Sequence, residues 1–368
     1  MAQTGVSLLH FFPSFSVGGQ QRRLAALIKA LGPAFSHRIY SLDGDVSAKS
    51  LIGAAAGNVT IEPLVIDKSR FVTIRNITRL RRAIAASNAD ILCTYNFGSI
   101  EAAIANRLGP RRPHLHHEDG FGADEAEGQK ATRVLARRFL LARSIVVVPS
   151  ITLERLARDG WKLDPARIRR IPVGVDVSSF FKDRGPRNGP VIVGSVGALR
   201  AEKNFARLIR CFETASEGSN ARLVIYGDGP ERAHLSEIAA QSAARAMVSL
   251  PGAVTAVADA LSALDIFALS SDTEQTPTSL MEAMAAGLPA IATDVGDIAD
   301  LASQSGREFI ISAGDEAAYA RKLRQLIDDA ELRERLGSDN RARAAAFDQA
   351  PMIEGFRKLY LEMLDGSC

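Results

Sequence analysis

Short runs of β-branched and other apolar residues alternate with longer stretches of helical periodicity along the whole chain. The runs predict strands at Val6–Phe12, His37–Leu42, Val59–Ile66, Asp90–Thr94, Pro113–Glu118, Ser144–Pro149, Val191–Val196, Arg222–Tyr226, Asp265–Ser270 and Pro289–Thr293. The stretches between and after them predict helices near 20–32, 70–88, 97–109, 127–142, 150–160, 203–217, 230–243, 278–287, 314–330 and 331–347. Strands that alternate with helices indicate parallel sheets covered on both faces. Two such series predict an α/β chain of two Rossmann-like, doubly wound domains.

The two series are separated by a segment with the composition of a linker. Pro172–Asp176 precedes FFKDRGPRNGP, which is rich in Gly, Pro and charge, and the next expected strand begins straight after it. We therefore expect an N-terminal domain over residues 1–178 and a C-terminal domain over residues 179–349. The last segment, Met352–Leu364, repeats apolar residues at i, i+3, i+4 and i+7, which predicts one more helix.

Composition excludes several classes of protein. The chain has 368 residues, of which 46% are apolar and 24% are charged, so disordered, collagen-like and coiled-coil chains are excluded. No apolar run approaches the ~20 residues of a membrane span, and no basic segment precedes the first apolar stretch, so we expect neither a span nor a signal peptide. Cys93, Cys211 and Cys368 show no metal-ligand spacing, which favours free thiols in the cytoplasm.

The net charge of +3 conceals an asymmetry between the halves. Residues 1–170 carry a net +11 and residues 171–368 a net −8. The basic excess indicates either solvated helix faces or a surface for anionic lipid headgroups. The absence of zinc-finger spacing and arginine–glycine repeats argues against nucleic acid. The arginines that concentrate this charge are Arg79, Arg81, Arg82, Arg107, Arg111, Arg112, Arg133, Arg137, Arg138 and Arg143.

Ligands of open parallel sheets bind beyond the carboxyl ends of the strands, and three loops at such positions carry candidate chemistry. Gly18 and Gly19 follow the first strand and open a helix, where backbone N–H groups can approach an anion; a plain turn is the alternative. Arg200 and Lys203 follow Val191–Val196, where two cations can neutralise a diphosphate or simply face solvent.

The third loop, after Asp265–Ser270, is the most informative. Glu274 lies at the turn into a helix, and Glu282 lies eight residues later among apolar neighbours, where a carboxylate needs a partner. Pro277 suits the first turn of that helix. Thr278 and Ser279 offer N–H groups and hydroxyls to an anion.

This segment, E-x7-E followed by EAMAAGLPAIATDVGD, resembles the donor-binding motif of retaining family 4 glycosyltransferases of the GT-B fold. The GG loop, HLHHEDG near residue 116, IPVGVD, VGALRAEKN and LVIYGDGPER agree with that family in order and spacing, so the resemblance covers nearly the whole chain. It implies two domains that face a cleft, with the last helix, residues 350–368, packed on the N-terminal domain. It also implies transfer of a hexose, with retention, from a nucleotide sugar to a lipid-linked, glycolipid or polysaccharide acceptor. A UDP-sugar is favoured over GDP-mannose.

The resemblance also implies roles for the donor-side residues. Glu282 would hold the ribose hydroxyls, and Glu274 would contact the donor sugar and take part in catalysis. Arg200 and Lys203 would bind the diphosphate and stabilise the leaving group. Thr278 and Ser279 would complete the donor site. The chain departs from the family at Gln275 and Thr276, which lie against the sugar.

On the acceptor side, Gly18 and Gly19 would approach donor phosphate and acceptor. His116 would be the active-site histidine, with His117 and Glu118 as its neighbours. The chemistry leaves front-side attack and double displacement open.

We expect no metal or other cofactor. Asp43-Gly-Asp45 matches a D-x-D metal pattern but also suits a surface turn, and Arg200 and Lys203 already supply the cations. The expected partners are a nucleotide sugar, the acceptor and an anionic membrane, with the protein peripheral on the inner face of the cytoplasmic membrane. A GT-B epimerase, a non-catalytic nucleotide-sugar-binding protein and a dehydrogenase are the alternatives.

Overall fold

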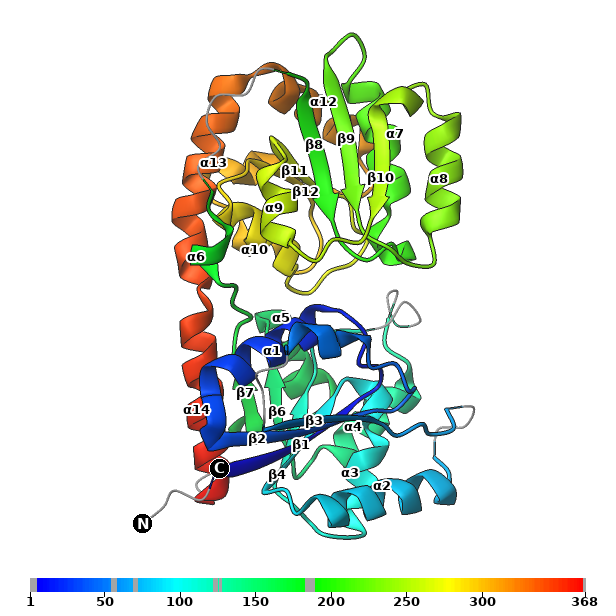
Figure 1. Ribbon diagram of the computed structural model, residues 1–368, viewed down its shortest axis with the longest axis vertical. Helices are drawn as coiled ribbons and strands as arrows, with labels where there is room; N and C mark the ends of the chain where they lie inside the picture. Colours follow the sequence, from blue (N-terminus) through cyan, green and yellow to red (C-terminus); the bar gives the residue numbers. More distant parts are fainter. Residues whose placement is uncertain are drawn as a thin grey trace. The chain divides into compact units, whose positions relative to one another are not determined.

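The computed structural model describes residues 5–53, 58–68, 72–121, 125, 128–182 and 189–366, and the chain divides into two compact units (Figure 1). Unit 1 is Met1–Val173 with Ala350–Cys368, and unit 2 is Gly174–Gln349. The sequence placed the first boundary after residue 178. Cys368 and residues 183–188 of the expected linker lie outside the described residues. Each unit is a parallel sheet with helices against it, which confirms the expected α/β fold of two Rossmann-like domains.

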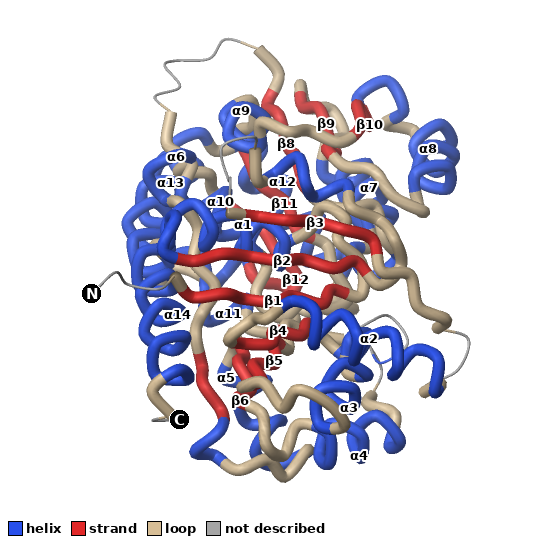
Figure 2. The backbone as a smooth tube through the Cα atoms, turned by 60° about the horizontal axis from the view of Figure 1, so that its bottom comes forward, coloured by secondary structure: helices blue, strands red, loops and turns tan. Residues whose placement is uncertain are grey.

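Unit 1 is built on a seven-stranded sheet of order β3-β2-β1-β4-β5-β6-β7, in which every pair is parallel. Its strands are β1 (Val6–Phe12), β2 (Phe35–Ser41), β3 (Val59–Pro63), β4 (Ile91–Tyr95), β5 (His114–His117), β6 (Ile145–Val148) and β7 (Ile168–Arg170). Its helices are α1 (Gly19–Leu31), α2 (Ile74–Ser87), α3 (Glu101–Arg107), α4 (Ala131–Leu140), α5 (Ile151–Arg155) and α14 (Gln349–Leu364). Figure 2 shows β1, β2 and β3 side by side, with α1 and α2 near them.

Unit 2 repeats this plan with six strands in the order β10-β9-β8-β11-β12-β13. Its strands are β8 (Val191–Val196), β9 (Ala221–Tyr226), β10 (Val248–Gly252), β11 (Ile266–Leu269), β12 (Ala290–Thr293) and β13 (Ile310–Ile311). Its helices are α6 (Val177–Phe180), α7 (Phe205–Ala215), α8 (Arg232–Gln241), α9 (Val257–Ser262), α10 (Thr278–Ala285), α11 (Ile298–Leu301), α12 (Glu316–Asp328) and α13 (Ala330–Ala344). The central strands are buried on both faces, as parallel sheets require.

The last helix of the chain belongs to unit 1. Met352, Phe356, Leu359, Tyr360 and Met363 of α14 are buried in the same core cluster as β1 and β4. These residues form one stripe of the helix, so the apolar period of the sequence is the period of the packing. The chain thus passes from unit 1 to unit 2 after Val173 and continues in unit 1 again from Ala350, in α14.

The first and last residues of unit 2 are hydrogen-bonded to each other. The Val175 N–H donates to Phe347 O (2.9 Å), and the Gln349 N–H donates to Val175 O (3.0 Å). A Cβ atom at Gly174 would collide with the backbone at Asp348 and Gln349, so this close approach requires glycine.

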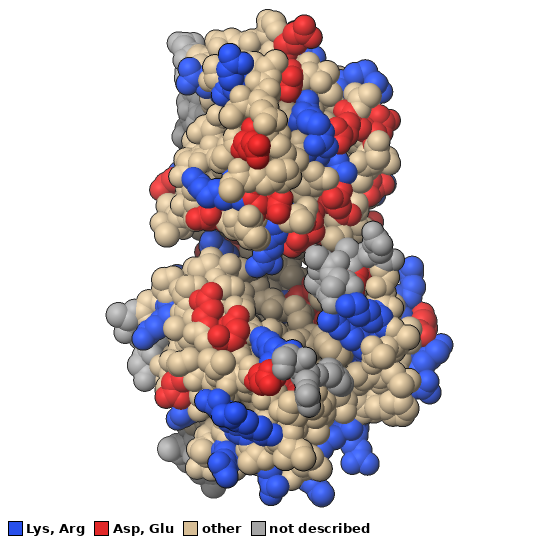
Figure 3. Space-filling model, turned by 90° about the vertical axis from the view of Figure 1, so that its right-hand side faces the viewer, with Lys and Arg blue, Asp and Glu red and all other residues tan. Residues whose placement is uncertain are grey.

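The surface chemistry matches the sequence expectations only in part. Figure 3 shows Lys and Arg side chains spread over the visible face of unit 1. Arg137 is a correction: only 1% of its side chain is exposed, so it contributes nothing to a basic surface. Cys93 and Cys211 are buried free thiols. Within the described part of the chain, no helix has the length and apolar character needed to cross a bilayer.

Candidate functional site

Each sheet has a point at which the strand order reverses, and ligands of this fold class bind there. In unit 2 the reversal lies between the adjacent strands β8 and β11. The loop after β8 carries Arg200 and Lys203, and the loop after β11 carries Glu274. The two loops that the sequence singled out therefore lie side by side.

Lys203 and Glu274 form the centre of this arrangement. The Lys203 ammonium is ion-paired with Glu274 Oε1, and the side chains are 22% and 10% exposed. Ser271 Oγ donates to the same carboxylate oxygen at 2.7 Å. Both charges are thus held in place while they remain open to solvent on one side. Such a pair can exchange partners with a charged ligand.

Further hydrogen bonds fix the two loops to each other. The Asp272 N–H donates to Glu202 O (2.8 Å), and Ser270 Oγ donates to Lys203 O (3.1 Å). The Asn204 side-chain amide donates to Asp272 Oδ2 (3.0 Å). Asn204 adopts a left-handed φ of 42°, and its Oδ1 caps α7 by accepting from the Arg207 N–H (3.1 Å). The loop conformation is therefore set before any ligand binds.

Glycines allow the neighbouring backbones to approach. A Cβ atom on Gly227 or Gly229 would collide with the main chain of Gly197 or Leu199, and one on Gly296 would collide with the carbonyl of Glu274. Gly296 also has a φ of 60°, which favours glycine. Glycine at these positions thus lets the loops after β8, β9 and β12 pack closely.

The remaining donor-side candidates lie on or beside the same loops. Arg200 is 54% exposed, with Glu202 3.9 Å away as its charged neighbour. Thr278 and Ser279 begin α10, and Glu282 is half-buried further along that helix. Thr278 and Glu282 are four residues apart, so they share one face of α10. Unit 2 therefore carries all the expected donor residues except the glycine pair.

The reversal point of unit 1 lies between β1 and β4. Gly18 and Gly19 follow β1, and Gly18 is the N-cap of α1. Beside them stand Gln20 and Arg23 of α1, Asn96 after β4 and Asp119 after β5, linked by hydrogen bonds. The sequence did not predict that these four side chains lie together.

His116 does not lie at that edge. It is fully buried in β5, with Thr94 Oγ1 2.7 Å from its Nδ1 and Glu118 Oε2 3.4 Å from its Nε2. Its neighbours His117 and Glu118 are buried as well. His116 is thus enclosed by protein near the end of β5, and its expected contact with substrate stays a prediction.

The side chain that does reach the edge is Asp119, three residues further along. Its side chain is 15% exposed. The sequence carried a signal for it, since Asp119 is the first residue after the expected strand Pro113–Glu118 and ligand-binding residues follow strands. The family resemblance drew attention to histidine instead.

Asp43 and Asp45 form a turn. Asp43 Oδ1 accepts from Ser41 Oγ (2.9 Å) and from the Asp45 N–H (3.0 Å), while Asp45 Oδ1 accepts from the Ser47 N–H (2.8 Å). Among the residues that the structure describes, no group of three or more His, Cys, Asp or Glu side chains could hold a metal ion.

Comparison with known proteins identifies the family. The model of the family described as Glycosyltransferase Family 4 matches residues 17–179, and that of Glycosyl transferases group 1 matches residues 176–343. The N-acetyl-alpha-D-glucosaminyl L-malate synthase of Bacillus anthracis is 26% identical over 192 residues, 51% of this chain and 50% of that protein. A GDP-mannose-dependent alpha-mannosyltransferase of Mycobacterium tuberculosis is 30% identical over 263 residues, 64% of each chain. The chain spans about half the length of the curated relatives it matches.

The fold has close counterparts among solved structures. HepE of Anabaena, solved in complex with UDP, superposes with a TM-score of 0.78 at 17% identity, covering 96% of this chain and 99% of that one. At this identity the likeness concerns the fold. The two family models together match residues 17–343, so the chain belongs to the family 4 glycosyltransferases and has the GT-B fold.

Proposed function

We propose that this protein transfers a hexose from a nucleotide sugar to a glycan or lipid-linked acceptor, with retention of configuration at the transferred carbon. The observation that carries the proposal is the Lys203–Glu274 pair at the reversal point of unit 2. The pair combines a cation for a diphosphate with a carboxylate for sugar hydroxyls, on two loops already fixed to each other.

The chemistry of transfer explains why these residue types are needed. As the diphosphate leaves, negative charge grows on it and the sugar becomes oxocarbenium-like. Fixed cations aimed at the growing charge lower the barrier, and removing one such group typically costs about 2.7–4 kcal/mol. In our proposal Arg200 and Lys203 stabilise the diphosphate, with Thr278 and Ser279 at the start of α10 as further donors. No metal or other cofactor is required.

Glu274 and Glu282 would select the donor. Binding of the nucleotide releases Lys203 to the diphosphate and leaves Glu274 to accept hydrogen bonds from the sugar. Glu282, on the face of α10 shared with Thr278, would accept from the ribose hydroxyls. Gly18 and Gly19 would approach donor phosphate and acceptor from unit 1.

UDP is the favoured nucleotide. HepE, whose fold this chain shares, has been solved with UDP, with UDP and glucose, and with UDP-glucose. A GDP-mannose-dependent relative keeps GDP as the competing choice. Gln275 and Thr276 lie in the loop that carries Glu274, so they are positioned to influence which sugar is accepted.

A membrane-bound acceptor is supported by the surface of unit 1. This unit carries 27 Lys and Arg residues against 17 Asp and Glu residues. On α4, Leu135 and Phe139 are 55% and 59% exposed, and the Arg138 guanidinium lies 5.9 Å from the Phe139 ring. Exposed apolar side chains beside arginines suit a peripheral site on an anionic bilayer, which would be the inner face of the cytoplasmic membrane.

The test is a screen of purified protein against UDP, GDP and their sugars. A nucleotide at 100 times its dissociation constant raises the free energy of unfolding by about 2.7 kcal/mol, which a thermal shift detects. We expect UDP and one UDP-sugar to stabilise the protein, with slow release of UDP from that sugar. Binding without any turnover, with or without acceptor, would favour the non-catalytic alternative. Interconversion of two nucleotide sugars would favour the epimerase.

A further inference from the structure

The reversal point of unit 1 carries a group of planar polar side chains whose roles the donor chemistry does not explain. Asn96 follows β4, Asp119 follows β5, and Gln20 lies in the first turn of α1. The Gln20 amide donates to Asn96 Oδ1 (3.1 Å) and to Asp119 Oδ2 (2.5 Å), and the Asp119 N–H donates to Asn96 Oδ1 (2.9 Å). Three separate elements thus meet at one place.

Asn96 is held in an unfavourable backbone conformation. Its φ is 51° and its ψ is 175°, and it precedes the 3-10 turn Phe97–Ser99, whose Ser99 N–H donates to its carbonyl (3.3 Å). Such strain costs of the order of 1–3 kcal/mol and is concentrated at functional sites. Its Oδ1 is used twice inside the protein, whereas its amide NH₂ donates to none of the residues that the structure describes. That group is a donor available to a ligand.

Asp119 is the complementary acceptor. Arg23 holds its carboxylate from one side through two nitrogens, one of them 2.7 Å from Oδ2, and Arg23 itself is buried. The carboxylate is therefore fixed in orientation, and part of it is open to solvent. A carboxylate accepts up to four hydrogen bonds, so acceptor capacity remains after Arg23 and Gln20 are counted.

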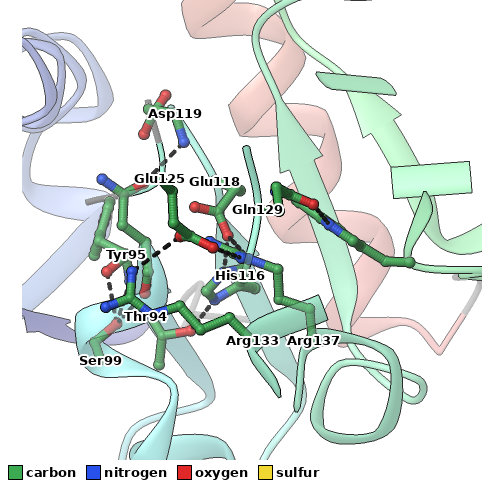
Figure 4. A network of polar contacts seen from close by, with 12 residues as sticks. Thr94, Tyr95, Ser99, His116, Glu118, Asp119, Glu125, Gln129, Arg133 and Arg137 are labelled. Atoms are coloured by element: carbon green, nitrogen blue, oxygen red, sulfur yellow. Dashed lines mark hydrogen bonds and ion pairs between the residues drawn. The ribbon is translucent and has the colours of Figure 1, made fainter. Parts of the chain in front are cut away.

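A buried network fixes the segment that presents Asp119. Figure 4 shows Arg137 of α4 joined to Glu118, the residue before Asp119, and to Glu125. The Arg137 guanidinium also lies 5.0–5.2 Å from the rings of Phe97, Phe121 and Trp161. The interior thus holds the end of β5 rigidly, as a preorganised binding group requires.

We propose that Asn96 and Asp119 bind two neighbouring hydroxyl groups of a neutral sugar, which makes the acceptor of this enzyme a glycoside rather than a bare phosphate. The assignment rests on the proposed glycosyltransferase function and names the acceptor class at the site in unit 1. The Asn96 amide can donate a hydrogen bond and the Asp119 carboxylate can accept one. Two neighbouring hydroxyls of a sugar match this pair, because each hydroxyl both donates and accepts. A phosphate group offers only acceptor oxygens at neutral pH and would be repelled by the Asp119 carboxylate.

The test measures binding of small glycosides directly and needs no turnover. Methyl α-D-glucopyranoside, methyl α-D-mannopyranoside, methyl β-D-galactopyranoside and glycerol 3-phosphate are titrated against the full chain by ligand-observed NMR. We expect at least one glycoside to bind. We expect Asp119→Asn to weaken that binding about tenfold to a hundredfold, the effect of losing a charge-assisted hydrogen bond. UDP affinity, measured in parallel, should not change.

Two further variants keep the proposal falsifiable. Asp119→Asn leaves Arg23 without its charge partner and can destabilise the fold, so Asn96→Gly is the second test, because glycine accepts the left-handed φ and removes only the side chain. Asp43→Asn is the control, since Asp43 is an exposed carboxylate in a turn of the same unit. Binding of glycerol 3-phosphate but of no glycoside would overturn the proposal. So would glycoside binding that Asn96→Gly leaves unchanged. Failure of the wild type to bind any nucleotide would instead refute the proposed function.

Discussion

The two units share one architecture but place their charged groups differently. In unit 2 the key pair, Lys203 and Glu274, lies at the sheet edge and is partly exposed. In unit 1 a larger set of titratable groups is buried: five of the six histidines of the chain lie there with no exposed ring, while His234 of unit 2 is exposed. The same fold thus holds a partly exposed ion pair in unit 2 and, in unit 1, buried histidines that must stay uncharged. The difference teaches that likeness of fold does not imply likeness of response to pH.

The buried histidines should make unit 1 the acid-sensitive unit, the largest effect that we predict. Burial lowers the pKa of His37 to about 4 and of His114 to about 3, and it lowers the pKa of His10 and His117 as well. Below pH 6.5 the unfolded chain binds protons that the folded chain cannot. For His37 and His114 the free energy of unfolding therefore falls by about 1.4 kcal/mol per pH unit each, until the folded pKa is reached. At pH 5 that is about 2 kcal/mol for each of the two, and His10 and His117 act in the same direction.

Trp161 makes this measurable, because it is the only tryptophan and lies buried in unit 1. The free energy of unfolding, measured by denaturant unfolding with Trp161 fluorescence as the signal, should fall steeply between pH 6.5 and 5. His114→Gln should reduce that slope, whereas His234→Gln in unit 2 should not alter it. Hydrogen exchange would report the stability of each unit separately. An equal loss of stability in both units on acidification would contradict the predicted difference between them.

Replacing one buried side chain of α14 by alanine should destabilise unit 1 and leave unit 2 stable. Phe356 is fully buried in unit 1, with its ring 5.4 Å from that of His117. Phe356→Ala should lower the free energy of unfolding of unit 1 by about 3–5 kcal/mol. Leu361→Ala, on the exposed side of the same helix, is the matched control and should have little effect. A Phe356→Ala protein as stable as the wild type would show that the helix is not part of the unit 1 core.

Lys203→Met should reduce turnover while the fold of both units is kept. Loss of a cation that stabilises the leaving diphosphate should lower kcat by a factor of about 10²–10³. Lys322→Met is the control for loss of a lysine elsewhere in unit 2, since Lys322 is ion-paired with Glu308 and does not lie in the loops after β8 and β11. Steady-state kinetics with the preferred nucleotide sugar gives the comparison. Similar rates for both variants would remove Lys203 from the mechanism.

The sequence predicted most elements because their apolar patterns are strong, and it failed where burial is one-sided. The three strands that it missed are β7, β10 and β13, which lie at the edges of the sheets. β7 and β13 have only 3 and 2 residues, and β10 contains Pro251 and alternates half-buried with exposed residues. An edge strand has one neighbour, so its sequence carries less of the apolar signal.

Local sequence also placed the residues of unit 2 better than those of unit 1. Lys203 and Glu274 each stand next to a recognisable strand end, and the adjacency of β8 and β11 brings them together. His116 and Arg137 look like surface candidates by type, yet both are buried. Arg137 is paired with Glu118, 19 residues earlier in the chain, and His116 is hydrogen-bonded to Thr94, 22 residues earlier. Pairing of this kind is a property of the folded chain and leaves no periodic pattern.

The most direct test of the account is hydrogen exchange of the full chain with and without saturating UDP, repeated with GDP. If unit 2 holds the nucleotide at the Lys203–Glu274 pair, one of the two should slow exchange in residues 197–204 and 270–286. The interior strands β1 and β4 of unit 1 should exchange as before. Protection of neither loop by either nucleotide, or protection confined to unit 1, would contradict the claim that this pair forms the donor site.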